Sequence, residues 1–206
     1  MKKQTLSLNE CKTYFNNKLK KYSGRYINFM ISGGSICNVL SNLLELEENK
    51  IDSSKWNIYF TDERIDKDNT NFKTAHNLLC KIKPQKINQM AMDYDNLEAE
   101  RQRYEDLIKN VNIDIAIMGI GYNGHICSIW PNDKSIESDK YVLNVEVNDE
   151  FTRRQTITPK FINEKITELI FFIPLKDGKR KEFSEPDKSI KDKLNIKYEI
   201  VLQKLE

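Results

Sequence analysis

Apolar residues in this chain gather in short continuous runs, and between the runs they recur at helical spacing. A continuous apolar run bounded by turn residues is typical of a strand buried on both faces of a parallel sheet. Such runs predict strands at Tyr26–Ile31, Trp56–Phe60, from Ile113 to the glycine at position 119, Tyr141–Val147 and Leu169–Ile173, with Ile196–Leu202 as a candidate last strand.

Helices are predicted between these strands. The capping-box pair Ser7 and Glu10 opens one helix, and a second is predicted over Ile36–Leu46. Two more are marked by apolar positions at helical spacing, from Phe72 to Leu79 and from Leu97 to Ile108. The polar stretch 184–193 is expected to be a surface helix or connector. Because strands alternate with helices, the sequence predicts an α/β fold with a largely parallel sheet flanked by helices.

Composition narrows the class of protein. The chain has 206 residues, which suits a single domain over residues 1–206, and its 33 Lys and Arg nearly balance its 31 Asp and Glu. This balance gives no indication of a nucleic-acid or membrane partner, and no apolar run approaches the ~20 residues of a membrane span. The four cysteines are scattered, and the N-terminus lacks the apolar core of a signal peptide. We therefore expect reduced thiols and a cytoplasmic location.

Two predicted strand ends carry residues that suit a ligand site. The first is the turn Ser32-Gly33-Gly34-Ser35, whose backbone N–H groups at the start of a helix can cradle an anion. Taken alone, a Gly-Gly pair is more often a plain tight turn. The second is Asp62-Glu63-Arg64, which is either a solvated cap or a carboxylate and a guanidinium placed over a substrate.

A third strand end is the segment Gly119-x-Gly121-x-x-Gly124-His125. Its glycines permit a sharp turn close to a ligand, and its histidine can transfer protons near neutral pH. A dinucleotide site with this glycine spacing needs an acidic residue at the end of the next strand, whereas Glu137 and Asp139 lie in a polar loop. Because the carboxyl ends of neighbouring parallel strands meet in one crevice, we expect the three ends to converge.

Together these segments resemble the 6-phosphogluconolactonase family, within the glucosamine/galactosamine-6-phosphate isomerase superfamily. The resemblance covers most of the chain, from the first predicted strand to about Lys179. It implies a Rossmann-like fold without a cofactor, and hydrolysis of 6-phosphoglucono-δ-lactone in the oxidative pentose phosphate pathway. The matching positions are Ser32–Ser35, Trp56, Asp62-Glu63-Arg64, Asn71-Phe72, Gly119 to His125 with Ser128 and Pro131, Arg154, Thr156, Thr158, and Ile162-Asn163.

Carried over by motif position, the resemblance makes His125 the catalytic acid/base and places Asp62 and Arg64 in the catalytic cleft. The implied substrate- and phosphate-binding residues are Ser32, Gly33, Gly34, Ser35, Asn123, Gly124, Arg154 and Lys179. The spacing around Lys179 differs from the family pattern, so Arg180 and Lys181 remain candidates. The family also has Thr-Pro where this chain has Ile36-Cys37, and Asp where it has Asn123, which removes a charge close to the histidine.

No metal, cofactor or cysteine nucleophile is expected. The chain has two histidines and neither a His-x-x-x-His nor a Cys-x-x-Cys pair. His76 is interpreted as a surface residue, and Cys127 as a small packing residue. The expected partner is a small sugar-phosphate lactone, and the protein is expected to be a monomer.

Two other functions stay open. A glucosamine-6-phosphate deaminase/isomerase shares the glycine–histidine segment, but its continuation Phe-Asn-Glu-Pro carries a catalytic glutamate. This chain has Ile129 and Trp130 there, and it has Arg64 where the deaminase has a tyrosine. The second alternative is a catalytically inactive homologue that binds a sugar phosphate.

Overall fold

The computed structural model describes residues 2–175 and 183–204. At its centre lies a seven-stranded sheet in the order β1-β10-β9-β6-β2-β3-β5, in which every neighbouring pair is parallel. Its strands are β1 (Lys2–Leu6), β2 (Ile27–Ile31), β3 (Trp56–Phe60), β5 (Lys86–Asn88), β6 (Ile113–Met118), β9 (Ile166–Ile173) and β10 (Tyr198–Gln203). The prediction of an α/β fold with a largely parallel sheet is confirmed.

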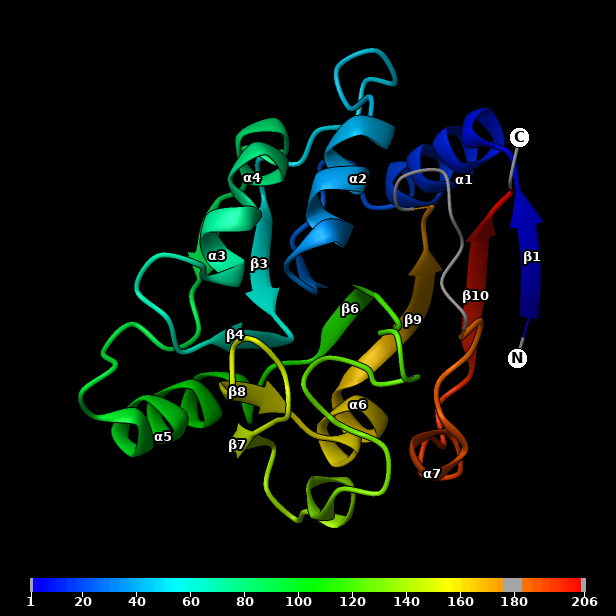
Figure 1. The fold of residues 1–206 in the computed structure, drawn as a ribbon. Helices are drawn as coiled ribbons and strands as arrows, with labels where there is room; N and C mark the ends of the chain where they lie inside the picture. The colour runs from blue at the N-terminus through cyan, green and yellow to red at the C-terminus, as the bar shows by residue number, and fades with distance from the viewer. Residues whose placement is uncertain (1, 176–182, 205–206) are drawn as a thin grey trace.

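A second, smaller sheet lies beside the carboxyl ends of the central strands. Its three strands are antiparallel in the order β4-β8-β7, with β4 at Asp62–Arg64, β8 at Arg153–Ile157 and β7 at Val142–Glu146. Only Thr61 separates β4 from β3, so the chain passes directly from the large sheet into the small one. Figure 1 shows the small sheet next to α5 and α6, below the large sheet.

Helices cover both sides of the large sheet. In Figure 1, α1 to α4 gather on one side, and α5, α6 and the small sheet lie on the other. Their bounds are α1 (Leu8–Lys20), α2 (Ser35–Leu43), α3 (Asn71–Thr74), α4 (His76–Ile82), α5 (Leu97–Ile108), α6 (Pro159–Lys165), α7 (Lys188–Lys191) and the 3-10 helix η1 (Lys134–Glu137).

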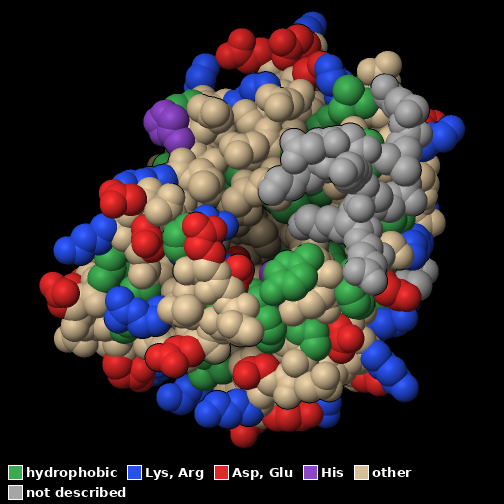
Figure 2. Space-filling view, in the orientation of Figure 1, with side chains coloured by type: hydrophobic (Ala, Val, Ile, Leu, Met, Phe, Trp, Pro, Cys, Tyr) green, Lys and Arg blue, Asp and Glu red, His purple; other side chains and the backbone are tan. Residues whose placement is uncertain are grey.

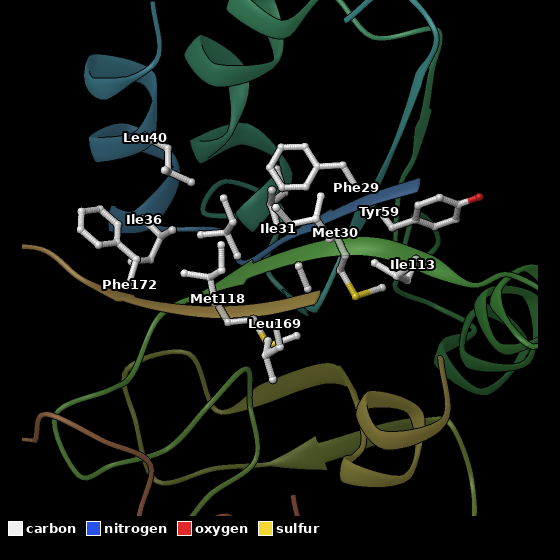
Figure 3. Close-up of a cluster of buried hydrophobic side chains, with 14 of the residues drawn as sticks. Phe29, Met30, Ile31, Ile36, Leu40, Tyr59, Ile113, Met118, Leu169 and Phe172 are labelled. Carbon is white, nitrogen blue, oxygen red and sulfur yellow. The ribbon is translucent and has the colours of Figure 1, made fainter. Parts of the chain in front are cut away.

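The central strands β2, β3, β6 and β9 are mostly apolar because both of their faces are covered. Successive residues of β2 point to opposite sides, and Figure 3 shows Phe29 and Met30 projecting into the two layers. Leu40 of α2 and Phe172 of β9 belong to the same buried cluster, and all four side chains are fully inaccessible to solvent. This is the packing expected from continuous apolar runs.

Most helix and strand predictions are confirmed, with altered ends. Ser7 caps α1 as a capping box: its Oγ accepts from the N–H of Glu10 at 3.3 Å, and its own N–H donates to Oε2 of Glu10 at 2.7 Å. Helix α2 ends at Leu43, before the predicted end at Leu46, and the helix predicted from Phe72 is divided into α3 and α4 at Ala75.

Several predictions are wrong or incomplete. Asp62–Arg64, expected at the end of the strand before it, is a separate strand, and the strand predicted at Tyr141–Val147 belongs to the small antiparallel sheet. Strands β1, β5 and β8 and helix α6 were not predicted. Strand β1 lies at the sheet edge and has one apolar residue, Leu6, so it shows no apolar run. The stretch 184–193, expected to be a surface helix or connector, contains α7.

Candidate active site

A cavity of about 460 Å³ lies at the carboxyl ends of β2, β3 and β6. Figure 2 shows it as a hollow near the centre of the viewed face. This is where an open parallel sheet places its ligands. The three strand ends singled out in the sequence therefore do converge. The cavity is lined by Ser32–Ile36, Asp62, Arg64, Asn71, Gly119–Tyr122, His125, Cys127, Asp149 and Arg154.

The Ser32–Ser35 turn forms one wall of the cavity. Gly34 has φ +68°, which favours glycine, and a Cβ on Gly33 would lie 2.2 Å from Cβ of Asn71. The N-terminus of α2 follows without a side-chain cap, although the N–H of Gly34 already donates to Oγ1 of Thr74 at 2.8 Å. The predicted anion cradle is therefore reduced by one donor and retains the positive end of α2.

The glycine turn after β6 makes room for the histidine ring. A Cβ on Gly121 would lie 2.0–2.4 Å from three ring atoms of His125, so any other residue there would displace the ring from this orientation. The turn is closed by the N–H of Gly121, which donates to the carbonyl of His125 at 2.8 Å, and Gly124 adopts φ +83°. Gly121 and Gly124 therefore position the ring of His125, and they need not contact a ligand themselves.

The His125 ring is held in one orientation and one tautomer. Its face stacks on Trp130 with centroids 4.0 Å apart, and Tyr122 meets it edge-on. Oδ1 of Asn123 lies 2.6 Å from Nδ1 and also accepts from the backbone N–H of His125 at 3.2 Å. An oxygen that accepts from this N–H has no proton to give, so Nδ1 donates. In the neutral ring, Nε2 therefore carries the lone pair.

Asp62 lies beneath the cavity in a network of hydroxyl groups. It is 4% exposed and accepts from Oγ1 of Thr61 at 2.8 Å and from Oγ of Ser128 at 2.9 Å. Oγ1 of Thr61 also lies 3.0 Å from Oγ of Ser32. The network ties together the ends of β2 and β3 and the segment after His125, so Asp62 positions the strand ends that line the cavity.

Two arginines stand directly opposite each other in the small sheet. Arg64 of β4 is the cross-strand partner of Arg154 of β8, and both line the cavity. Like charges placed in this way repel unless an anion lies between or beside them. The Arg64 guanidinium lies 4.5 Å over the ring of Phe151, and its buried Nε has no hydrogen-bond partner among residues 2–175 and 183–204.

Arg154 is held more tightly. Its Nε donates to the carbonyl of Phe151 at 2.7 Å, and its Nη2 pairs with Oδ2 of Asp149 at 2.7 Å. Its guanidinium also lies 5.9 Å from the ring of Trp130, which stacks on the histidine.

The side chain of Glu63 lies on the opposite face of β4 from those of Asp62 and Arg64, on the side away from the cavity. It is fully buried and accepts from the N–H groups of Arg64 at 2.7 Å, Phe72 at 2.9 Å and Asn71. Burial raises the pKa of Glu63 to about 7, against the opposing effect of these hydrogen bonds. It thereby fixes the start of α3 and places Asn71 against Gly33.

The remaining sequence-based assignments fall into three groups. Lys179, Arg180 and Lys181 lie outside the described residues. His76 is exposed, as expected, and Cys127 is buried in the core, where burial raises the pKa of its thiol well above 9. Across residues 2–175 and 183–204, no three His, Cys, Asp or Glu side chains are grouped so that they could hold a metal ion.

No helix in the same ranges has the length and apolar character needed to span a membrane.

Four residues at the site were missed from the sequence: Tyr122, Trp130, Asp149 and Phe151. Tyr122 and Trp130 lie close to His125 in the sequence, so their position in or next to the glycine turn could have predicted contacts with its ring. Asp149 and Phe151 lie in a polar segment with no strand or helix pattern. The pairing of β7 with β8 brings Asp149 to the cavity and places Phe151 against the two arginines.

The fold and the cavity define a Rossmann-like α/β protein with a ligand cavity at its strand ends. The chain belongs to the family described as glucosamine-6-phosphate isomerases/6-phosphogluconolactonase, which it matches over residues 3–185. It is 31% identical over 191 residues to 6-phosphogluconolactonase 3 of Saccharomyces cerevisiae, covering 82% of this chain and 70% of the yeast protein.

Solved structures show the same fold. 6-Phosphogluconolactonase from Thermotoga maritima superposes with a TM-score of 0.77 at 19% identity, covering 98% of this chain and 99% of that one. A monomeric glucosamine-6-phosphate deaminase superposes with a TM-score of 0.72 at 16% identity, covering 99% and 98%. Because both branches of the family share this architecture, the side chains of the cavity must distinguish between them.

Proposed function

We propose that this protein hydrolyses 6-phosphoglucono-δ-lactone to 6-phosphogluconate, without a metal ion or cofactor, as a cytoplasmic monomer. The observation that carries the proposal is the orientation of His125: Nδ1 is bound to Asn123, which leaves the lone pair on Nε2, beside a cavity that contains two arginines. The name of the yeast relative supports the same reaction.

The reaction needs two proton transfers, and one histidine can perform both. Nε2 of His125 accepts a proton from water as the water oxygen bonds to the lactone carbonyl carbon. The resulting tetrahedral oxyanion collapses, the bond from that carbon to the ring oxygen breaks, and the imidazolium returns its proton to the ring oxygen. The new carboxylic acid then loses its proton to solvent.

The arginines are assigned separate tasks. Arg154, with the Ser32–Ser35 turn and Lys179, binds the phosphate, because a guanidinium matches phosphate geometry. Arg64 stabilises the oxyanion, because its guanidinium lines the cavity and can donate to an oxygen that gains negative charge. Asp62 positions these strand ends through Thr61 and Ser128. Asn123 and Gly124 set the histidine turn.

The deaminase alternative is disfavoured by the segment after the histidine. A catalytic carboxylate is absent at positions 129 and 130. Ile129 is fully buried, and Trp130 is stacked on the ring of His125. These two side chains occupy positions that a deaminase uses for its chemistry.

The test is a lactonase assay on purified protein, corrected for the spontaneous hydrolysis of the lactone. We expect turnover with 6-phosphogluconolactone, much weaker use of unphosphorylated gluconolactone, and no ammonia release from glucosamine 6-phosphate. Steady ammonia release would favour the deaminase instead. Tight binding of 6-phosphogluconate without any turnover would identify an inactive binding homologue.

A further inference from the structure

The loop between β7 and β8 brings a carboxylate to the cavity wall. The N–H of Val147 donates to the carbonyl of Thr152 at 2.8 Å and closes the loop. Within it, Oδ1 of Asp149 accepts from the N–H of Glu150 at 2.8 Å, and Oδ2 pairs with Nη2 of Arg154 at 2.7 Å. Asp149 is therefore held from both sides and faces the arginine assigned to the phosphate.

The charges of the described cavity wall cancel formally when His125 is neutral. Two arginines, Arg64 and Arg154, face two carboxylates, Asp62 and Asp149. The Asp62 carboxylate accepts from two hydroxyl groups and does not contact either arginine. Asp149 is thus the one carboxylate, among the described lining residues, that neutralises a cavity arginine. A site for a phosphate dianion would be more attractive without it.

The need to orient the Arg154 side chain does not by itself explain why a carboxylate is present at position 149. The Phe151 carbonyl already binds Nε of Arg154 at 2.7 Å, and the Arg154 side chain is 7% exposed, so its position is restricted without Asp149. A neutral acceptor in that loop could also bind Nη2, although less strongly than a carboxylate does. What the carboxylate adds is negative charge next to the place where the phosphate binds.

We propose that Asp149 is a resident counter-ion of Arg154 that lowers the affinity of the cavity for phosphate esters and speeds release of the product. The inference rests on the proposed function for the identity of the ester. A phosphate bound to Arg154 would lie close to the Asp149 carboxylate, which pairs with the same guanidinium. The repulsion between these two negative charges is substantial even when it is partly screened. The ring-opened product carries one negative charge more than the lactone, so the repulsion disfavours the product more strongly.

The variant Asp149→Asn removes the charge and keeps one acceptor: the amide oxygen can still accept from Nη2 of Arg154, while the amide N–H₂ replaces the oxygen that accepts from the N–H of Glu150. The matched control is Glu150→Gln, which makes the same change in net charge on the next residue, where the side chain is exposed. The dissociation constant of inorganic phosphate is measured by calorimetry for the three proteins at one ionic strength. Thermal melting confirms that each is folded.

We expect Asp149→Asn to bind phosphate roughly 3- to 30-fold more tightly than the unmutated protein, and Glu150→Gln to stay within about twofold. Product inhibition by 6-phosphogluconate should tighten in parallel. Phosphate binding to Asp149→Asn that is equal, weaker or absent overturns the proposal and leaves Asp149 an orienting residue. If the lactone is not hydrolysed but the phosphate affinities change as expected, the proposed reaction fails and the role of Asp149 stands.

Discussion

The two sheets of this protein contribute to the cavity in different ways. The large parallel sheet has mostly apolar strands at its centre, and its strand ends supply glycine turns and a histidine. The small antiparallel sheet has short strands, two of which (β4 and β8) are mainly polar, and it supplies both arginines and the loop that contacts them. The first region places the proton-transfer group on a rigid support, and the second surrounds it with charges that recognise an anion.

This division predicts that the two regions affect different kinetic constants. Changes in the turn after β6 should act on the chemical step, and changes in β4, β8 and their loop should act on substrate binding. The contrast would fail if both kinds of variant changed kcat and KM in the same proportion.

The largest effect is expected from His125→Asn. Loss of the general acid/base should lower kcat by roughly 10²–10⁴-fold, while KM changes little. The half-buried ring contributes modestly to the core, so thermal melting should show a folded protein. Initial rates are measured after subtraction of spontaneous hydrolysis. A folded variant with near-normal kcat would refute the assignment of His125.

Next in size is Arg154→Ala in the small sheet. Removing a charge-assisted hydrogen-bond donor should raise KM by about 10- to 100-fold, with a smaller change in kcat. The comparison substrate is unphosphorylated gluconolactone, for which the variant and the unmutated protein should differ little. A loss of equal size on both substrates would show that Arg154 does not bind the phosphate.

A third prediction concerns the pH dependence of stability at Glu63, which joins the two regions. Because the folded-state pKa of about 7 lies above the ordinary value of 4.5, the native protein binds more protons between these values. The free energy of unfolding should therefore fall by about 1–3 kcal/mol as the pH rises from 4.5 to 7. Denaturant titrations across this range measure the slope.

The matched variants for this slope are Glu63→Gln and Glu48→Gln, the second at an exposed carboxylate. The slope should disappear in the first variant and persist in the second. Glu63→Gln should also be destabilised by about 1–3 kcal/mol at acidic pH, because its amide N–H₂ would face a backbone N–H group. A slope that persists in Glu63→Gln would contradict the assignment.

The smallest effect is expected from Asn123→Asp. A carboxylate next to Nδ1 favours the protonated ring, so the acidic limb of the pH–rate profile should move up by about one pH unit. The control is Asn148→Asp, which adds the same charge in the exposed part of the β7–β8 loop. An unchanged limb in Asn123→Asp would show that this side chain does not act through the histidine.

The sequence predicts best those features whose interacting residues are close together in the chain. The capping box of α1, strands β2, β3 and β6, and the glycine–histidine turn depend on residues close together in the chain, and all of them were found. Strand β8 was missed because it is short and polar. Its pairing with β4 joins Arg64 to Arg154, ninety positions away, and no local pattern records such a pairing.

The family resemblance brought Arg154 into the site, but it did not reveal that Arg154 faces Arg64 across two strands. It also did not reveal that Asp149 neutralises one of the two charges.

The sequence by itself determined the α/β class, the apolar strands and the three strand ends that carry Ser32–Ser35, Asp62–Arg64 and His125. These features are local because strand burial, helix capping and glycine turns are set by neighbouring residues. The tertiary structure alone decided the tautomer of His125, the placement of Arg64 opposite Arg154 and the pairing of Asp149 with Arg154. Each of these depends on distances between side chains, and those distances are set only when the turn after β6, the small sheet and the β7–β8 loop have folded.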